Sequence, residues 1–391
     1  MAKIKILTII ESFFPYYTGA GIFLFNLSKE LLKHNKFDIT ILTSGDKTLP
    51  SNDELDGIKI IRRGSFLKKK NTYLFMISGL WYLFFNLHKF DICYIIGDPN
   101  IAILARILCK IYKVKIVTRT TLLNSDDPLS IKRRKSGFLR YRSFLLSDAF
   151  IAISHPIMES FIRSGININK VYKIPNMVNT YRFKPLSRDK KDVIRQKLKL
   201  PLNRIIIISV GAVIYRKGWD ILLKAFKKVN QKYNTTFLLG VGPINKSSEY
   251  VSNIQKYIKK NNLINDILFV GEKDNIEKYM QASDIFVFPS RKEGFSTVII
   301  EAMATGLPCI ISELDGVTKN DIFIEENCGI IVNSYSPEDY AEAILDLMND
   351  FEKRKAMSLK SRKITEQYFS IKIVTKEYAK LFKQITGQSE Q

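Results

Sequence analysis

The chain of 391 residues is long enough for two domains that each bury a core of their own. Its content of 46% hydrophobic and 25% charged residues excludes a disordered chain and is typical of a globular protein. No run of 18 or more apolar residues occurs, so we expect no membrane-spanning helix, and "MAKIKILTII" is interpreted as a first strand rather than a signal peptide.

Positive charge is concentrated in the first half of the chain. The formal net charge is +23, and residues 1–185 hold 29 basic against 13 acidic residues, a net of +16. Such a field favours an anionic partner: a nucleic acid, an anionic membrane surface or a phosphate-bearing substrate. No nucleic-acid motif accompanies the charge, so we expect no nucleic-acid partner.

Short runs rich in β-branched residues alternate with helical patterns along the whole chain. Several runs lack polar alternation, which is typical of strands covered on both faces. The predicted strands cover residues 3–10, 37–44, 92–97, 115–120, 149–154, 204–211, 235–242, 266–271, 284–290, 308–312 and 329–332. Helical patterns lie between them, for example over residues 20–35 and 218–233. This alternation predicts an α/β fold with parallel sheets built from βαβ units.

The series of strands starts again near residue 204, after a charged stretch with two prolines. Residues 184–203 are interpreted as a linker with a short helix, so we predict two domains, residues 1–185 and 186–369. A final helix is expected over residues 370–386.

Two loops that follow predicted strands are candidate phosphate sites. "FFPYYTGAGIF" (13–23) opens a helix but lacks GxGxxG spacing, which argues against a nicotinamide dinucleotide. After the strand that ends at Gly211, Arg216 and Lys217 stand before a helix that starts near Gly218. Two cations there could clamp a diphosphate, with the arginine supplying a bidentate fork. In isolation the same pattern is also common in solvated loops.

Two glutamates, Glu293 and Glu301, bracket a predicted helix start in "PSRKEGFSTVIIEAMATGLPCIIS" (289–312). A buried strand ends just before this loop, and open α/β sheets bind ligands at the carboxyl ends of their strands. Ser296 or Thr297 can cap the helix, whose free N–H groups and dipole suit a phosphate. Glu301 lies about one turn inside the helix, where its carboxylate could accept hydrogen bonds from vicinal hydroxyls. The alternative is that Glu293 is a surface loop residue and that Glu301 balances the helix dipole.

Together these residues resemble family 4 of the retaining glycosyltransferases, which have the GT-B fold. The resemblance runs in order from the N-terminal glycine loop, through "VYKIPNMVNTYRFKP" (171–185), "RKG" and "GVGP", to residues 269–308 with the E-x7-E pair. It implies an α/β GT-B protein with two facing Rossmann-like domains and an interdomain cleft. The segment 370–391 would pack back on the N-terminal, acceptor-side domain, and the C-terminal domain would bind a nucleotide-sugar.

The resemblance also implies roles for individual residues. Arg216 and Lys217 would bind the diphosphate, Glu293 would hold hydroxyls of the transferred sugar, and Glu301 would bind the ribose. These three, Glu293, Arg216 and Lys217, are the expected catalytic residues. The expected donor-binding residues are Gly19, Gly211, Val270, Glu272, Gly294, Phe295, Ser296, Thr297 and Glu301.

The chemistry that the resemblance implies needs no metal ion and no cofactor. Cleavage of a glycosyl–phosphate bond builds negative charge on the leaving diphosphate, which Arg216, Lys217 and the helix dipole would stabilise. In a front-face reaction the leaving phosphate receives the proton of the acceptor, so no dedicated base is required. The chain has three histidines and no HExxH pattern, so we expect no metal site.

The chain departs from the family pattern at three places. Thr18-Gly19 replaces the usual Gly-Gly, and Met177 replaces a common glycine. Many members carry a histidine after the fourth strand, where this chain has Thr120 or Thr121 beside Arg119. Arg119, Thr120 and Thr121 are therefore the expected acceptor-side residues.

The first half of the chain also holds basic clusters beside aromatic runs, in residues 66–90 and 131–146. Residues 73–87 are interpreted as a buried helix. The basic residues favour a surface that faces an anionic membrane and a lipid-linked acceptor. They are Lys68, Lys69, Lys70, Arg133, Arg134, Lys135, Arg140 and Arg142.

The sequence therefore favours a glycosyltransferase that uses a nucleotide-sugar donor and a glycan or lipid-linked acceptor. We expect it in the cytoplasm, peripheral at the inner face of the cell membrane. The alternatives are another GT-B-type enzyme, such as an epimerase or a phosphorylase, and a non-catalytic sugar- or membrane-binding module.

Overall fold

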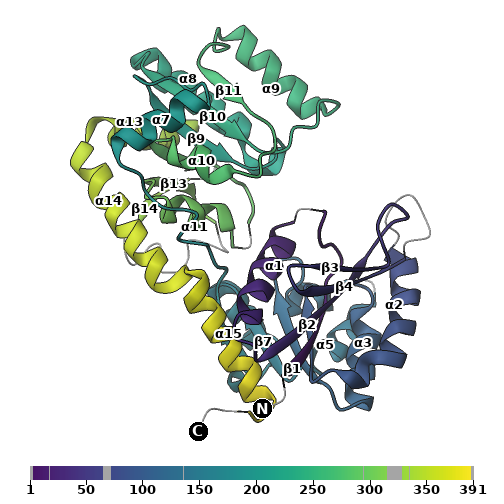
Figure 1. The fold of residues 1–391 in the computed structure, drawn as a ribbon. Coiled ribbons are helices and arrows are strands. Elements are labelled where there is room, and N and C mark those ends of the chain that lie inside the picture. Colours follow the sequence, from purple (N-terminus) through teal and green to yellow (C-terminus); the bar gives the residue numbers. More distant parts are fainter. Residues whose placement is uncertain are drawn as a thin grey trace. The chain divides into compact units, whose positions relative to one another are not determined.

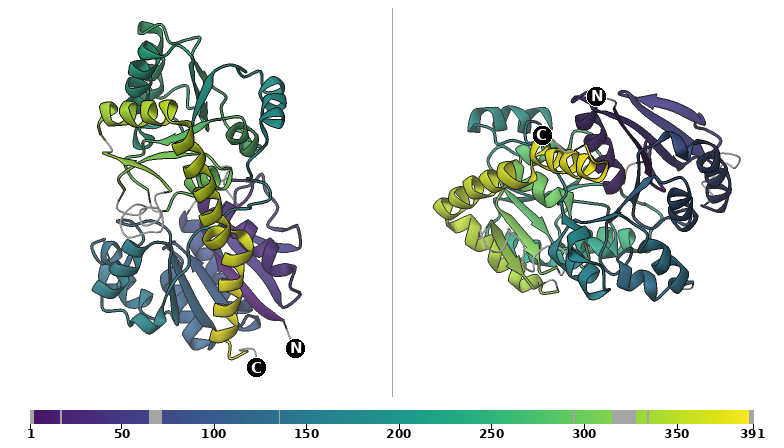
Figure 2. Two further views of the ribbon diagram at one scale, coloured as in Figure 1. Left: turned by 90° about the vertical axis from the view of Figure 1, so that its left-hand side faces the viewer. Right: turned by 90° about the horizontal axis from the view of Figure 1, so that it is seen from below.

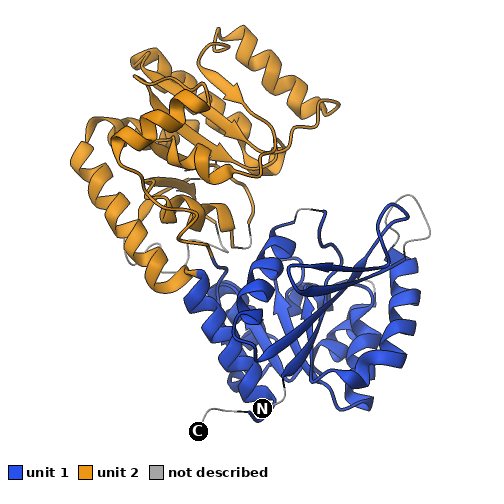
Figure 3. Ribbon diagram, in the orientation of Figure 1, with its two compact units in different colours: residues 1–177, 371–391 blue, residues 178–370 orange. Residues whose placement is uncertain are grey.

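The structure is a computed structural model that describes residues 3–16, 18–64, 72–134, 136–293, 295–314, 328–333 and 335–388 (Figure 1). The chain divides into two compact units (Figure 3). Unit 1 comprises Met1–Met177 and Ile371–Gln391, and unit 2 comprises Val178–Ser370.

Unit 1 is built around an eight-stranded sheet with the strand order β3-β4-β2-β1-β5-β6-β7-β8. β3 pairs antiparallel with β4, and the other strands pair in parallel. The strands are β1 (Ile4–Ile9), β2 (Phe37–Ser44), β3 (Asn52–Leu55), β4 (Ile58–Arg63), β5 (Ile92–Ile96), β6 (Lys115–Thr120), β7 (Ala149–Ala152) and β8 (Val171–Lys173). Because β1 pairs with both β2 and β5, the strand order reverses between β1 and β5.

Helices cover both faces of this sheet. They are α1 (Gly19–Leu32), α2 (Thr72–Asn86), the 3-10 turn η1 (Leu87–Lys89), α3 (Ala102–Ile111), α4 (Pro128–Lys132), α5 (Gly137–Phe144), α6 (His155–Arg163), the 3-10 turn η2 (Ile168–Lys170) and α15 (Ile371–Ile385). Side chains alternate along β1: Ile4 and Ile6 pack with α1 and α15, whereas Leu7 and Ile9 pack with α2 and α3. The C-terminal helix α15 lies against α1 (Figure 2).

Unit 2 has a six-stranded parallel sheet with the order β11-β10-β9-β12-β13-β14. The strands are β9 (Ile205–Val210), β10 (Thr236–Val241), β11 (Ile267–Phe269), β12 (Ile285–Phe288), β13 (Cys309–Ser312) and β14 (Gly329–Val332). The helices are α7 (Arg188–Lys197), the 3-10 turn η3 (Tyr215–Lys217), α8 (Trp219–Lys232), α9 (Glu249–Lys260), α10 (Ile276–Gln281), α11 (Thr297–Ala304), α13 (Pro337–Asn349), α14 (Phe351–Ile364) and the π-helical turn η4 (Thr365–Phe369). The predicted α/β fold with parallel sheets is confirmed.

The chain passes from unit 1 to unit 2 at Met177–Val178, which lies before the predicted boundary at residue 185. Local contacts explain the difference. The Val178 N–H donates to the carbonyl of Phe369 (2.8 Å), and Arg362 donates to the carbonyl of Phe183 (2.7 Å). These bonds attach residues 178–183, which lie just before the predicted linker, to unit 2.

Candidate active site

Two loops meet at the carboxyl end of the sheet in unit 2. β9 pairs with both β10 and β12, so the strand order reverses between β9 and β12, and such a switch point is where open α/β sheets bind ligands. The loop after β9 carries Arg216 and Lys217, and the loop after β12 carries Glu293. The backbone N–H of Arg291 donates to the Arg216 carbonyl at 2.8 Å. The sheet therefore brings together residues that are more than 70 positions apart in the sequence.

Glu293 is the centre of an ionic cluster in these loops. Its Oε1 accepts from Lys217 Nζ at 2.6 Å and from Arg216 Nη1 at 2.7 Å. The Ser290 hydroxyl donates to the same oxygen at 2.8 Å. The expected catalytic residues are therefore in contact with one another, and Ser290 joins them.

Two glycines allow this close approach. Gly218 has a left-handed φ of 70°, and a Cβ there would lie 1.9 Å from the Pro289 carbonyl oxygen. Any larger residue would separate the two loops. At Gly211 a Cβ would lie 3.3 Å from the Lys217 side chain, so the glycine leaves space for the lysine.

The Lys217 ammonium lies in a largely enclosed position. Its Nζ is 4.7 Å from the centre of the Phe288 ring, and the side chain is 13% exposed. Burial lowers the pKa of Lys217, while the Glu293 carboxylate opposes that shift. A cation in such surroundings interacts strongly with any anion that replaces the glutamate.

A second ion pair, between Arg291 and Asp220, stabilises the same two loops. Arg291 donates to both carboxylate oxygens of Asp220, at 2.9 and 2.8 Å, and its guanidinium stacks 3.9 Å from the Tyr215 ring centre. Tyr250 donates to Asp220 as well (2.7 Å). The sequence analysis did not identify these residues, although Asp220 and Arg291 lie next to the two motifs that it used.

Glu301 lies on α11 and differs from Glu293 in its surroundings. Within the described residues, no hydrogen bond or ion pair engages its carboxylate. Burial raises the pKa of Glu301 to about 8, Arg182 lowers it and Glu277 raises it. Arg182 is itself paired with Glu277 at 2.8 Å. Glu301 is thus a half-buried acid with free acceptor capacity.

The other expected donor-binding residues of unit 2 lie at the start of α11 and just after β11. Ser296 is the buried N-cap residue of α11, and Thr297 is its first residue. The Phe295 ring lies 5.7 Å from that of Phe369. Val270 extends the β11–β10 pairing through its N–H (2.9 Å to the Gly240 carbonyl), and Glu272 is exposed. Gly294 lies outside the described residues.

Comparison with known proteins agrees with this arrangement. The family model described as "Glycosyl transferases group 1" matches residues 190–364, and that of "Glycosyltransferase Family 4" matches residues 17–182. The chain belongs to glycosyltransferase family 4. The family assignment from the sequence is therefore confirmed, and the chain is a glycosyltransferase.

Three similar proteins illustrate the relationship. An uncharacterised glycosyltransferase of Methanocaldococcus jannaschii is 24% identical over 99% of this chain and 100% of its own length. The UDP-Gal:alpha-D-GlcNAc-diphosphoundecaprenol alpha-1,3-galactosyltransferase of Escherichia coli is 25% identical over 82% of each chain. The crystal structure of Anabaena HepE has a TM-score of 0.77 at 18% identity and covers 97% of this chain and 100% of its own. The last similarity shows that the glycosyltransferase has the GT-B fold.

The expected acceptor-side residues of the glycosyltransferase lie at the end of β6. Arg119 is 1% exposed, donates to Asn176 and lies 3.8 Å over the Phe23 ring. Thr120 is buried, and the Thr121 hydroxyl donates to Asp126 (2.6 Å). Internal partners hold all three residues, and their acceptor role stays a prediction. Gly19, expected near the diphosphate, is the first residue of α1, where a Cβ would meet no atom within 4 Å.

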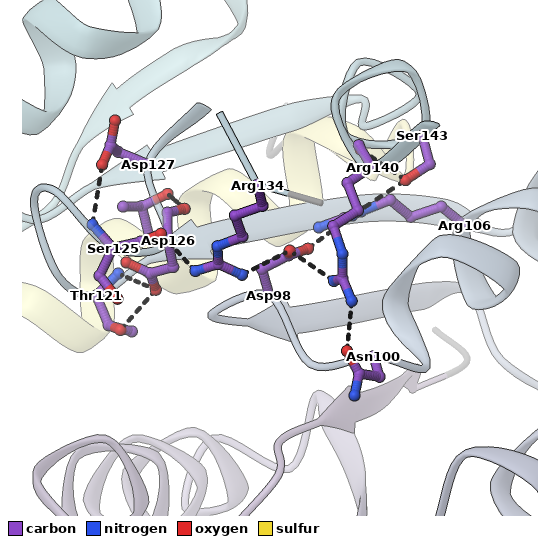
Figure 4. Close-up of polar contacts among 11 residues, drawn as sticks. Asp98, Asn100, Arg106, Thr121, Ser125, Asp126, Asp127, Arg134, Arg140 and Ser143 are labelled. Carbon is purple, nitrogen blue, oxygen red and sulfur yellow. Dashed lines mark hydrogen bonds and ion pairs between the residues drawn. The ribbon is translucent and has the colours of Figure 1, made fainter. Parts of the chain in front are cut away.

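Two of the basic residues expected at a membrane are bound internally (Figure 4). Asp98, just after β5, is paired with Arg106 at 3.4 Å, Arg134 at 3.5 Å and Arg140 at 3.0 Å. The side chains of Asp98 and Arg106 are 1% and 0% exposed. Arg134 and Arg140 therefore bind a buried carboxylate of unit 1, although the Arg134 side chain is still 38% exposed. Arg133 and Arg142 are exposed, and Lys68, Lys69, Lys70 and Lys135 lie outside the described residues.

The exposure of the helix α2 differs from the prediction. Residues 73–87 were interpreted as a buried helix, but only Phe75, Gly79 and Leu83 of α2 are buried. The opposite side carries exposed aromatic side chains, including Trp81 at 65%. Within the described ranges, no helix is both long and apolar enough to cross a membrane, and no three His, Cys, Asp or Glu residues are placed to hold a metal ion.

Proposed function

We propose that this glycosyltransferase transfers a sugar from a nucleotide-diphosphate sugar to a glycan or lipid-linked acceptor, with retention of configuration and without a metal ion. The setting we propose is the synthesis of surface polysaccharide or glycolipid, with the enzyme in the cytoplasm and peripheral at the inner face of the cell membrane.

One observation carries the proposal: three donors converge on a single carboxylate oxygen at the switch point of unit 2. Lys217, Arg216 and Ser290 all bind Glu293 Oε1. A carboxylate oxygen and a phosphate oxygen accept the same hydrogen bonds, so these donors suit a diphosphate. In the structure the Glu293 carboxylate accepts from all three donors.

The roles follow from this geometry. A diphosphate that displaces Glu293 from Lys217 and Arg216 would leave the glutamate free to accept from hydroxyls of the sugar. As the glycosyl–phosphate bond breaks, the two fixed cations stabilise the charge on the leaving diphosphate without reorganisation of solvent. The leaving phosphate oxygen takes the proton of the acceptor hydroxyl on the same face, so no separate base is needed. Glu301, with free acceptor capacity, would bind the ribose hydroxyls.

The names of similar proteins support the substrate classes. HepE was crystallised with UDP and with UDP-glucose. The galactosyltransferase of Escherichia coli is named for a UDP-sugar donor and a diphosphoundecaprenol acceptor. The positive charge of the first half of our chain is compatible with a phosphate-bearing acceptor at an anionic surface.

A thermal-shift screen against UDP-, GDP- and ADP-sugars tests donor binding, because a ligand that binds only the folded state raises the melting temperature. Product analysis then tests the reaction: we expect an α-linked product from an α-linked donor, formed equally well with excess chelator. Loss of activity with chelator would contradict metal independence. Turnover of donor without any acceptor or water adduct would favour an epimerase, and donor binding without turnover would favour a non-catalytic module.

A further inference from the structure

One surface of unit 1 is unusually apolar. Along α2, the side chains of Tyr73, Ile77, Trp81, Phe84 and Phe85 are each more than half exposed. They are spaced by three or four residues and so form a single stripe. The Trp81 and Phe85 rings stack at 5.5 Å, which makes the stripe a continuous aromatic surface.

Two neighbouring helices extend this surface. The helix α3 packs against both α2 and α5, and α2 and α3 cover the same face of the unit-1 sheet (Figure 1). Tyr112, the C-cap of α3, donates to the carbonyl of Phe84 at 2.8 Å. Exposed apolar side chains on these two helices are Leu104, Ile107, Ile111, Phe138 and Leu139. We call these five residues and the α2 stripe the apolar face.

Exposure of this kind requires an explanation. Isolated apolar residues are common on protein surfaces, but monomeric proteins rarely expose a contiguous patch of large apolar side chains unless it binds a partner. Five residues of one helix and five of the two adjoining helices constitute such a patch. In unit 2, exposed apolar residues such as Ile264, Tyr335 and Phe351 lie in two separate loops and at the start of α14, and share no helix face.

The charges around the apolar face favour one partner. None of α2, α3 and α5 contains an Asp or a Glu, although Arg106 and Arg140 pair with Asp98 and Lys110 pairs with Asp148. The cations lie beside aromatic rings: Arg142 is 5.2 Å over Phe138, and Lys132 is 5.4 Å over Tyr141. A second copy docked on the same face would bring like charges together, whereas an anionic bilayer offers both an apolar interior and opposite charge.

We propose that α2, α3 and α5 insert the apolar face into the surface of an anionic lipid leaflet. Aromatic residues at the depth of the headgroups, with cations beside them, are the usual chemistry of such contacts. The inference rests on the proposed function for its membrane setting, and it names the surface that makes the contact. It needs no donor chemistry, so the two can be tested separately.

The two tryptophans allow a direct test. Trp81 is 65% exposed on the apolar face, whereas Trp219 is 1% exposed in unit 2. With Trp219→Phe protein and phosphatidylcholine vesicles containing about a third phosphatidylglycerol, we expect a blue shift of Trp81 emission and quenching by brominated acyl chains. Vesicles of phosphatidylcholine alone should give a much smaller response. Sedimentation with anionic vesicles without any change in Trp81 emission would overturn the proposal.

Two double variants distinguish insertion of the apolar face from nonspecific hydrophobic adsorption to vesicles. Trp81→Ser/Phe85→Ser should weaken binding to anionic vesicles at least about tenfold, because two large aromatic side chains no longer leave water. Ile264→Ser/Phe351→Ser removes equally exposed residues from unit 2 and should leave vesicle binding unchanged. Equal effects of the two pairs would contradict the inference, as would vesicle-independent dimerisation that only Trp81→Ser/Phe85→Ser abolishes.

The first pair should retain wild-type hydrolysis of a soluble nucleotide-sugar, which also shows that it folds. If the wild-type enzyme hydrolyses no donor but still inserts Trp81, the proposed function fails and the membrane inference stands. If donor hydrolysis is normal and Trp81 stays in water, the membrane inference fails and the proposed function stands.

Discussion

Two carboxylates, Glu293 in unit 2 and Asp98 in unit 1, make a useful comparison. Each follows a strand at which the strand order of its sheet reverses, and each is bound by more than one cation. Their exposure differs. Arg216 is 45% exposed beside Glu293, whereas Asp98 and Arg106 are almost completely buried.

This difference shows that clustered charge at a switch point does not by itself mark a ligand site. In unit 2 Arg216 is reachable and Glu293 is 11% exposed, so an anion can approach and replace the glutamate. In unit 1 the carboxylate is enclosed by Arg106, Arg134 and Arg140, which also bind neighbouring loops. We therefore expect the Asp98 cluster to stabilise the fold and the Glu293 cluster to bind substrate.

The largest expected effect is on stability. Asp98→Ala would leave Arg106 buried without a carboxylate, and removal of one partner from a buried pair typically costs about 3–5 kcal/mol. We expect the free energy of unfolding, measured by denaturant titration, to fall by about this amount. The surface pair Lys353–Asp346 (2.6 Å) provides the control, because Asp346→Ala should cost less than about 1 kcal/mol. Similar values for the two variants would show that the Asp98 cluster is not structural.

The next effect is on catalysis. Lys217→Ala removes a cation that would stabilise the leaving diphosphate, and loss of one such donor typically lowers kcat about 100- to 1000-fold. We expect this loss in a transfer assay, with little change in melting temperature. Lys228, which pairs with Glu338 on the surface of unit 2, is the matched control, and Lys228→Ala should keep full activity. Wild-type turnover in Lys217→Ala would remove the role that we assign to the lysine.

The sequence predicted three residues that the structure brings together, but not the residues around them. Arg216, Lys217 and Glu293 lie in loops whose glycines and flanking strands are local signals, and the sheet brings them together. The partners Ser290, Asp220 and Arg291 were missed, because nothing in a single sequence indicates that a serine will share an acceptor with a lysine 73 positions earlier.

Tertiary context explains the other differences. Asp56 and Gly57 form the turn of the β3–β4 hairpin with φ values of 49° and 81°, and an Asp-Gly pair is a strong hairpin signal that the predicted strands did not use. The run in α2 is apolar all round, which predicts burial when read alone. Its outer stripe is exposed because no described element of unit 1 covers it. Likewise, only the fold reveals that Arg134 and Arg140 bind Asp98.

A smaller effect concerns pH and Glu301. Its pKa of about 8 in the folded protein lies above the ordinary value of 4.5, so the folded state binds more protons than the unfolded state between these limits. Stability from this group is therefore present below the lower value and is lost as pH rises towards the upper one, by at most about 1.4 kcal/mol per pH unit.

Glu301→Gln should flatten this pH dependence of the free energy of unfolding. The bond with Lys228 lowers the pKa of Glu338 below this range, so Glu338→Gln should leave the slope between the two values as in the wild type. An unchanged slope in Glu301→Gln would show that the carboxylate is not desolvated as the structure indicates.

The smallest expected effect is a change in the affinity for a nucleoside diphosphate. In the free enzyme Glu293 competes with a diphosphate for Lys217 and Arg216. Glu293→Gln removes the negative charge and weakens the competitor, so a nucleoside diphosphate should bind about three- to tenfold more tightly, a gain on the order of 1 kcal/mol. Transfer should fall in the same variant, because the glutamine no longer offers a carboxylate to the sugar. Tighter binding of the nucleoside diphosphate together with slower transfer would show that Glu293 binds the two cations until a diphosphate displaces it.

Isothermal titration calorimetry with the nucleoside diphosphate measures this gain directly. Asp98→Asn is the matched variant from unit 1. It should leave the affinity for the nucleoside diphosphate unchanged, because Asp98 is enclosed and an anion cannot take its place. Weaker binding by Glu293→Gln would mean that the glutamate orients the two cations instead of competing for them. A gain in Asp98→Asn would mean that the enclosed cluster also accepts anions, and the distinction between the two carboxylates would fail.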